Sequence, residues 1–349
     1  MNSPLQNKEF DPSGVGLKNG NFIGLPFDED SANVVLIPVP WDVTVSYNDG
    51  TSHAPSAILD ASSQLDLFDA DVTDAWKLGI FMQPLDEILM GKGKELRKQS
   101  STYISFLENG GDLAQNRGMQ EELEKINREC EKMNQWVFRR AQKVLGTGKI
   151  PAVIGGDHSV PLGAMKAVGE KYPDFGILQV DAHLDLRNSY EGFTFSHASV
   201  FYNALKIQSL KKLVQVGIRD YCEEETEVIQ KEGNRIAVYF DHAIKQNQFK
   251  GKNWDAQCEE IVAELPADVY VSIDIDGLDP KLCQHTGTPV PGGLDFPETV
   301  FLLKKVVESG RRVIGFDVCE TGNAEWDANV AARLIYKLSN LSGRSQKMI

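Results

Sequence analysis

Two carboxylates and an imidazole stand close together at residues 181–185, where the sequence DAHLD follows soon after the apolar run FGIL (175–178). Asp181, His183 and Asp185 lie where a buried strand is expected to end, and charged groups crowded there repel one another and resist loss of water. A metal cation compensates both costs. Aspartate and histidine are also ordinary strand-end and turn residues, so the triplet alone does not decide the question.

Two further segments place similar residues after an apolar run. In PAVIGGDHSVP (151–161), His158 follows a pair of glycines that permit a tight turn of the backbone. In VYVSIDIDGLDP (269–280), Asp274 and Asp276 are two residues apart and are therefore expected to face the same side of a strand. Ligand sites in open α/β sheets lie outside the carboxyl ends of the strands, so these three segments are predicted to converge.

The three segments supply six candidate metal ligands: His158, Asp181, His183, Asp185, Asp274 and Asp276. Imidazole and carboxylate ligands suit manganese, zinc, iron, cobalt or nickel, whereas a structural zinc site usually includes thiolates. Six ligands with several carboxylates exceed what one ion needs. A pair of ions about 3.5–4 Å apart uses such a set, and ion pairs of this kind activate water for hydrolysis.

The rest of the chain alternates short apolar runs with longer amphipathic stretches, the pattern of a mostly parallel sheet covered by helices. Strands are predicted at residues 33–39, 77–82, 151–156, 175–181, 212–218, 235–240, 268–276 and 311–318. Helices are predicted at residues 161–172, 255–266, 296–309 and 327–339. These repeated units predict one catalytic domain over residues 31–349, after an N-terminal extension (1–30) and with a helical excursion at about 91–135.

The bulk composition narrows the classes of partner. The chain has 349 residues and a net charge of −14, and an acidic protein is poorly suited to bind nucleic acid or an anionic membrane. It contains no apolar run near the roughly 20 residues that a membrane helix needs, and its first residues lack the pattern of a signal peptide. The five cysteines include no CxxC pair, which favours reduced thiols and a cytoplasmic location.

Four segments resemble the signature motifs of one enzyme family. GGDHS (155–159), DAHLD (181–185), SIDIDGLDP (272–280) and TGTPVPGGL (286–294) are similar, in order and spacing, to motifs of the arginase/agmatinase/formimidoylglutamase (ureohydrolase) family. The similarity extends from PVPWDV (38–43) to the last helix. It implies a three-layer αβα fold around an eight-stranded, mostly parallel sheet, and two Mn²⁺ ions per subunit, with Ni²⁺, Co²⁺ and Zn²⁺ as alternatives.

The resemblance assigns a role to each candidate ligand. The residues that match the ligands of one ion are His158, Asp181, Asp185 and Asp274. Those that match the ligands of the other are Asp181, His183, Asp274 and Asp276. Asp181 and Asp274 are therefore expected to bridge the two ions. Asp185 also matches the carboxylate that holds a hydroxide between the ions and passes its proton to the leaving amine.

Three further residues match positions on the substrate side of the family's site. Glu320, in DVCETGN, matches the glutamate that receives the guanidinium group, and a carboxylate suits that planar cation. His197, in TFSHASV, matches a histidine at the mouth of the site that shuttles protons. Arg187 lies two residues after Asp185, where it either meets a substrate carboxylate or faces solvent.

The resemblance thus implies hydrolysis of a guanidino substrate to urea and an amine, by attack of the hydroxide on the guanidinium carbon, with agmatine narrowly preferred over arginine. Arg187 keeps open a formimidoylglutamate, guanidine or guanidino-acid hydrolase, and a non-catalytic metal-binding scaffold is the remote alternative. Substrate identity is the open question, because the departures GTSHAP, SHAS and TGNAEWD lie where the substrate tail is expected. The family also implies a homo-oligomer, either a trimer or a hexamer.

Overall fold

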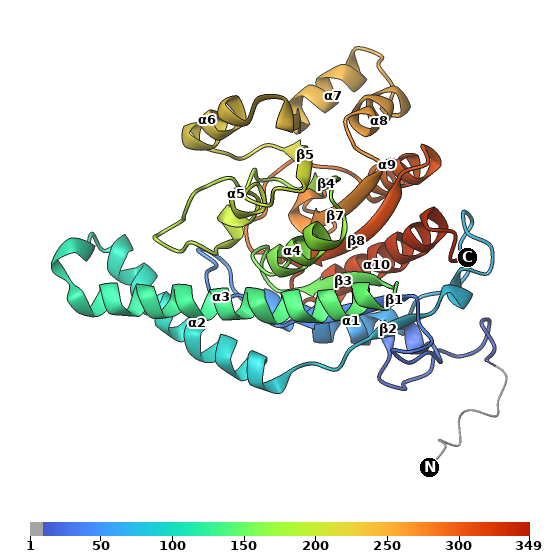
Figure 1. Ribbon diagram of the computed structural model, residues 1–349, viewed down its shortest axis with the longest axis horizontal. Helices are drawn as coiled ribbons and strands as arrows, with labels where there is room; N and C mark the ends of the chain where they lie inside the picture. Colours follow the sequence, from blue (N-terminus) through green and yellow to red (C-terminus); the bar gives the residue numbers. More distant parts are fainter. Residues whose placement is uncertain (1–9) are drawn as a thin grey trace.

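An eight-stranded parallel β-sheet forms the centre of the protein, whose computed structural model describes residues 10–349 (Figure 1). Its strands are β1 (Val34–Val39), β2 (Ile80–Met82), β3 (Ile150–Gly155), β4 (Phe175–Val180), β5 (Leu210–Ile218), β6 (Ile236–Phe240), β7 (Asp268–Asp274) and β8 (Arg312–Cys319). They lie in the order β2-β1-β3-β8-β7-β4-β5-β6, and all neighbouring strands are parallel.

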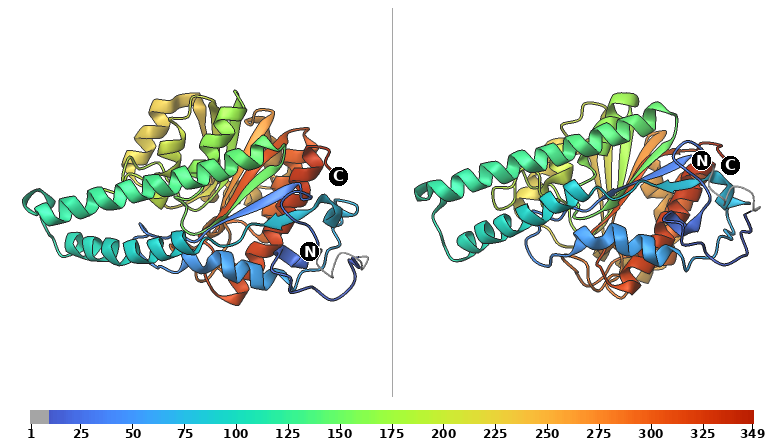
Figure 2. Two further views of the ribbon diagram at one scale, coloured as in Figure 1. Left: turned by 60° about the horizontal axis from the view of Figure 1, so that its bottom comes forward. Right: turned by 90° about the horizontal axis from the view of Figure 1, so that it is seen from below.

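Helices cover both faces of this sheet (Figures 1 and 2). The helices that pack on one face are α1 (Ala54–Ser62), α7 (Asp241–Phe249), α8 (Trp254–Ala263), α9 (Phe296–Glu308) and α10 (Glu325–Ser345). Those that pack on the other are α2 (Glu87–Glu108), α3 (Arg117–Gly146), α4 (Leu162–Lys171), α5 (Val200–Ala204) and α6 (Glu223–Glu232). The predicted three-layer αβα fold is therefore confirmed.

The central strands are buried on both faces because helices lie on each side. Side chains alternate between two apolar cores, so that Val34 and Leu36 of β1 face one core and Val35 and Ile37 face the other. Parallel strands covered in this way appear in the sequence as continuous apolar runs, without the polar alternation of a half-exposed strand. This is why all eight strands could be located from the sequence.

Two predicted strands are shorter by two or more residues in the structure. Residues 75–78 form a 3₁₀ turn that ends at Gly79, whose φ is 75°, so β2 begins at Ile80 and not at residue 77. Strand β7 ends at Asp274 and not at residue 276, because the Asp274 carboxylate accepts a hydrogen bond from the Asp276 N–H. This bond caps a 3₁₀ turn over Ile275–Gly277 that carries Asp276 out of the strand.

The predicted helical excursion is a hairpin of α2 and α3 that projects beyond the body of the protein (Figure 2). Both helices extend past the predicted range of 91–135, since α2 begins at Glu87 and α3 ends at Gly146. The side chains of Asp86 and Asn116 cap the two N-termini by accepting hydrogen bonds from backbone N–H groups of the first turn.

Part of the predicted N-terminal extension covers the edge strand β2, while residues 1–9 lie outside the described residues. The Asn21 amide accepts a hydrogen bond from the Met82 N–H at 2.9 Å and donates one to the Ile80 carbonyl at 3.1 Å. These bonds occupy backbone groups that an edge strand otherwise leaves open for pairing. Among residues 10–349, no helix has both the length and the apolar character needed to cross a membrane.

Candidate metal centre and active site

The three segments singled out in the sequence converge because β3, β8, β7 and β4 are consecutive in the sheet. The carboxyl ends of these parallel strands meet at one edge, where residues that follow β4, β5 and β7 line a cavity. The structure brings all six predicted metal ligands together at this edge: His158, Asp181, His183, Asp185, Asp274 and Asp276.

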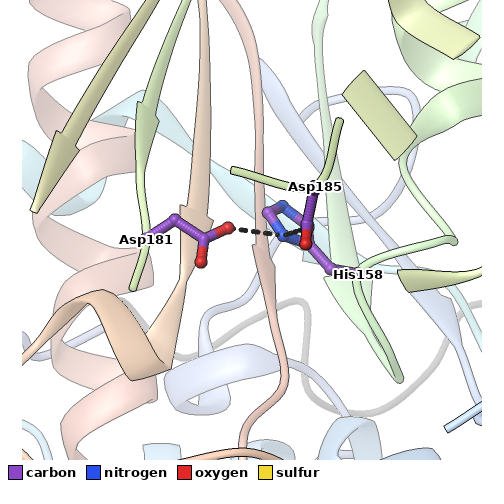
Figure 3. Close-up of side chains that lie close together, drawn as sticks. All are labelled: His158, Asp181 and Asp185. Atoms are coloured by element: carbon purple, nitrogen blue, oxygen red, sulfur yellow. Dashed lines mark ion pairs between the residues drawn. The ribbon is translucent and has the colours of Figure 1, made fainter. Parts of the chain in front are cut away.

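His158 is the centre of one group of converging atoms. Its Nδ1 lies 3.0 Å from Oδ2 of Asp181, 3.0 Å from Oδ2 of Asp185 and 3.3 Å from Oδ2 of Asp274. Figure 3 shows the first two carboxylates pointing toward the imidazole from either side. Nδ1 nevertheless has no partner with hydrogen-bond geometry within residues 10–349. Lone-pair atoms that converge in this way are a suitable ligand set for a metal cation.

His183 forms a second group, which shares Asp181 with the first. Nδ1 of His183 lies 3.1 Å from Oδ2 of Asp276 and 3.6 Å from Oδ1 of Asp181. The two oxygens of Asp181 thus face different imidazoles, as a bridging carboxylate requires. Within each group, His158–Asp181–Asp185 and Asp181–His183–Asp276, the ligand atoms lie within 4.8 Å of one another.

Loops beyond the strand ends aim these ligands, so a shared strand face, as predicted for Asp274 and Asp276, does not account for their convergence. Asp181 is the first residue after β4, and its Oδ1 accepts a hydrogen bond from the His183 N–H. Asp185 has a left-handed backbone with φ of 55°, which lets the loop turn back toward His158. A Cβ on Gly277 would lie 2.5 Å from the Asp181 nitrogen, so only glycine allows these two loops to touch.

The ligand cluster carries more negative charge than the surrounding protein neutralises. Burial raises the pKa of Asp185 to about 7, and the charge of Asp181 adds to this shift. Burial also raises the pKa of Asp274 well above its usual range, together with the charges of Asp276 and Asp181. Burial opposes protonation of His158, yet three neighbouring carboxylates hold its pKa well above the usual value. Divalent cations reverse these shifts by favouring ionised carboxylates and neutral imidazoles.

A cavity of about 420 Å³ opens onto the candidate ligands His183 and Asp185. His197, predicted to lie at the site mouth, is part of the cavity wall. Burial lowers the pKa of His197 to about 3, and the nearby His183 adds to this shift. The His197 imidazole is therefore neutral near pH 7.

Glu320 lies deeper than the cavity wall and presents an oxygen that lacks a partner. Its φ of 59° turns the chain directly after β8, and its Oε1 accepts a hydrogen bond from the His158 N–H at 2.9 Å. Its Oε2 is buried beside Gly287 and has no hydrogen-bond partner in the described part of the chain. Burial raises the pKa of Glu320 well above its usual range, and Asp157 adds to the shift. A planar cation bound here satisfies both the oxygen and the charge.

Comparison with known proteins gives matches along nearly the whole chain. The sequence profile described as "Arginase family" matches residues 32–339. The protein belongs to the arginase family. N(1)-aminopropylagmatine ureohydrolase of Thermus thermophilus is 32% identical to it, over 91% of this chain and 92% of its own length. Agmatinase of Bacillus subtilis is 27% identical, over 91% of this chain and 94% of its own.

Solved structures show the same fold. The agmatine ureohydrolase of Thermoplasma volcanium matches with a TM-score of 0.71 at 23% identity, covering 95% of this chain and 97% of its own. As an arginase-family protein with relatives named ureohydrolases, the chain is a hydrolase that acts on C–N bonds of amidines. The family typically holds two metal ions, and the two ligand groups described above provide two positions where a metal ion could bind.

The mouth of this arginase-family cavity contains residues that sequence analysis missed: Tyr47, Tyr190, Asp220, Tyr221 and Glu225. Asp220 comes soon after the end of β5. The search for polar residues after strand ends, which located the candidate metal ligands, could therefore have found it. Glu225 belongs to the acidic run EEE at the start of α6, which is typical of any helix N-terminus.

Glu225 is a buried carboxylate that organises one side of the mouth. It accepts hydrogen bonds from the N–H groups of Leu186 and Cys222, each at 3.0 Å, and so ties α6 to the loop that carries the ligands. Arg187 lies beside it, with Nε 4.0 Å from Oε2 of Glu225 and the guanidinium 4.9 Å from the centre of the Tyr190 ring. The charge of Arg187 is therefore partly offset within the protein.

Proposed function

We propose that this arginase-family enzyme uses two metal ions to hydrolyse the guanidino group of a substrate with a cationic tail, releasing urea and an amine. Agmatine and its aminopropyl derivative are the candidate substrates. The observation that carries the proposal is the pair of ligand groups that share Asp181 at the floor of a cavity, with the unpaired carboxylate of Glu320 behind them.

The donor set suits two Mn²⁺ ions because it combines imidazoles with several carboxylates and contains no thiolate; Ni²⁺, Co²⁺ and Zn²⁺ are the alternatives. The residues that would hold one ion are His158, Asp181, Asp185 and Asp274. Those that would hold the other are Asp181, His183, Asp274 and Asp276. When bound, such an ion pair supplies an activated water at neutral pH and stabilises the charge that develops on the reacting group.

Three side chains of the chain itself complete the reaction. Glu320 binds the guanidinium group through Oε2, the buried oxygen without a partner in the described residues. Asp185 lines the cavity beside the ligands, where its carboxylate carries a proton from the attacking water to the leaving amine. His197 lies on the cavity wall between the site and solvent, where its imidazole takes up and releases protons during turnover.

The charges at the cavity mouth favour a cationic tail. The Asp220 side chain is 68% exposed at the mouth, whereas the charge of Arg187 is offset by Glu225. The rings of Tyr47 and Tyr221 also line the mouth, and aromatic faces attract ammonium groups. Relatives of this chain are named for agmatine and for N(1)-aminopropylagmatine, which both end in an ammonium group.

The test is urea release by the manganese-loaded protein with agmatine, N(1)-aminopropylagmatine, arginine, guanidine and guanidinobutyrate in parallel. We expect one of the first two to give the highest kcat/KM. The Asp220→Asn variant should lower that value about tenfold at low salt, since an attractive charge at the mouth is removed. Asp174→Asn, which changes an exposed aspartate outside the cavity, is the matched control. Highest activity on guanidinobutyrate would contradict the cationic tail.

A substrate with a carboxylate tail is the second candidate, and the observation that favours it is Arg187 on the cavity wall. If Arg187 leaves Glu225 to bind such a tail, Arg187→Ala should abolish activity on formimidoylglutamate or guanidinobutyrate and spare agmatine. Formamide in place of urea identifies formimidoylglutamate. No product from any of these amidines with Mn²⁺, Ni²⁺, Co²⁺ or Zn²⁺ would favour the non-catalytic scaffold. A trimer or hexamer in the cytoplasm is likewise a proposal, which mass photometry and cell fractionation test.

A further inference from the structure

Four buried polar side chains lie next to one another across four strands of the sheet, directly before the ligand-bearing loops. The parallel register pairs Gln215 of β5 with Gln179 of β4, Gln179 with Ser272 of β7, and Ser272 with Asp317 of β8. All four are fully buried. We call these residues the polar row. Two of its members come two residues before a ligand, Gln179 before Asp181 and Ser272 before Asp274, so the row lies one layer beneath the metal centre.

Ser272, an inner member of the polar row, contacts His158. The Nε2 atom of this imidazole lies 3.0 Å from Oγ of Ser272, and Ser272 in turn donates a hydrogen bond to Oδ1 of Asp317 at 2.9 Å. Because Nδ1 faces the carboxylates of the centre, a neutral His158 that binds a cation through Nδ1 must carry its proton on Nε2. Ser272 then accepts a hydrogen bond from Nε2–H and donates its own O–H to Asp317, so the chain of hydrogen bonds selects this tautomer.

Gln179, the other inner member, contacts Asp181, the carboxylate shared by the two ligand groups. The Gln179 amide donates to Oδ2 of Asp181 at 2.7 Å and to the His183 carbonyl at 3.1 Å. The Gln215 amide donates to Oε1 of Gln179 at 2.6 Å and to the Leu184 carbonyl at 2.8 Å. The two glutamines therefore hold both a ligand carboxylate and the backbone of the loop that bears it.

Burying four polar side chains inside a sheet costs free energy compared with apolar side chains of similar size, so stability alone does not account for them. Contacts of this kind, in which a second layer of groups orients metal ligands, affect metal affinity strongly. We propose that the polar row positions the centre, with Ser272 and Asp317 fixing the ring and proton of His158 and the glutamines fixing Asp181. This inference rests on the proposed function, because it assumes that these residues bind metal.

The experiment measures manganese binding and not urea release. Equilibrium dialysis and electron paramagnetic resonance compare wild-type protein with Ser272→Ala and with Gln179→Met, which keeps a similar volume but cannot donate. The matched control is Ser342→Ala, which removes a fully buried hydroxyl that bonds only to the Leu338 carbonyl within α10. Thermal unfolding of the metal-free proteins reports any general loss of stability.

We expect Ser272→Ala to weaken binding of one of the two ions by tenfold or more, with loss of the spectrum of the coupled pair, and Gln179→Met to weaken both ions. Ser272→Thr keeps the hydroxyl and should restore binding. If Gln179→Met does not fold, the Ser272 series still decides the question.

A purely structural row predicts a different result: Ser272→Ala would lower the Tm of the metal-free protein, as Ser342→Ala does, and leave manganese affinity and spectrum unchanged. That outcome would overturn the inference. Wild-type protein that binds two ions but releases no urea contradicts only the proposed reaction, whereas wild-type protein that binds no manganese overturns the centre itself.

Discussion

Gly287 offers a direct test of where the guanidinium group binds. A Cβ at this position would lie 3.0 Å from Oε2 of Glu320, which is close to the place that a guanidinium nitrogen bonded to this oxygen must occupy. Gly287 is not among the residues with a left-handed backbone, so alanine fits its conformation. The Gly287→Ala variant therefore adds one methyl group at the proposed binding position without requiring a left-handed backbone.

The size of the effect follows from the bond that the methyl group prevents. Glu320 cannot easily retreat, because its Oε1 is held by the His158 N–H at 2.9 Å and its backbone is fixed in a turn with φ of 59°. A hydrogen bond to a charged group contributes about 1.5–3 kcal/mol, and the methyl group prevents the one that Oε2 would accept. Its loss corresponds to a fall in kcat/KM of roughly 10- to 10²-fold.

Urea release measures this fall, with manganese stoichiometry and Tm determined on the same samples. We expect both of these to stay near the wild-type values, because the nearest atoms to the new methyl group belong to Glu320 and the Asn48 carbonyl and not to a metal ligand. Gly91→Ala, in an exposed part of α2 with no atom within 4 Å of the new Cβ, is the control. Unchanged kcat/KM in Gly287→Ala would refute binding of the guanidinium group at Glu320.

Three further predictions test the centre and the packing around it. Asp276→Asn should abolish urea release and lower manganese stoichiometry in equilibrium dialysis, because one carboxylate of the Asp181–His183–Asp276 group is removed. Hydrogen bonds from Lys304 and Lys337 lower the pKa of Asp71 to about 2. The ionised Asp71 therefore stabilises the folded protein fully above about pH 4, and this contribution is lost as the pH falls toward 2. Asp71→Asn should remove this dependence in denaturant titrations and, allowing for partial exposure, cost about 1 kcal/mol at pH 7. Asn21→Ala should cost about 2–3 kcal/mol in urea unfolding with an unchanged m value, since two backbone groups of β2 lose their partner.

The strands could be predicted from the sequence because their signal is local. A run such as VVLIPV (34–39) is apolar on both faces and ends where the chain must turn, and no distant residue is needed to recognise it. The predicted start of β2, at residue 77, and the predicted end of β7, at residue 276, were wrong because of turn geometry. A glycine with positive φ and a carboxylate that caps a 3₁₀ turn each end the regular structure without changing the apolar pattern.

The candidate ligands could be predicted for a related reason, whereas the cavity mouth could not. Each ligand follows an apolar run, so a rule about strand ends was enough to collect them. The position of Arg187 depends on Glu225, which is 38 residues further along the chain, and on the Tyr190 ring. These contacts of Arg187 depend on side-chain packing between α6 and the loop that carries Arg187. No local sequence pattern encodes them.

The polar row shows how strand register connects the fold with the site. Side chains two residues apart share a face, so a residue two positions before a ligand lies under the ligand layer. On the opposite face the neighbouring positions Val180, Val214, Ile273 and Val318 belong to the apolar core against α8, α9 and α10. In these four strands the polar row thus lies on the one face beneath the candidate ligands. A shift of any of these strands by one residue would bury the row in the wrong core and separate His158 and Asp181 from their supports. The same register that builds the sheet therefore sets the geometry of the centre.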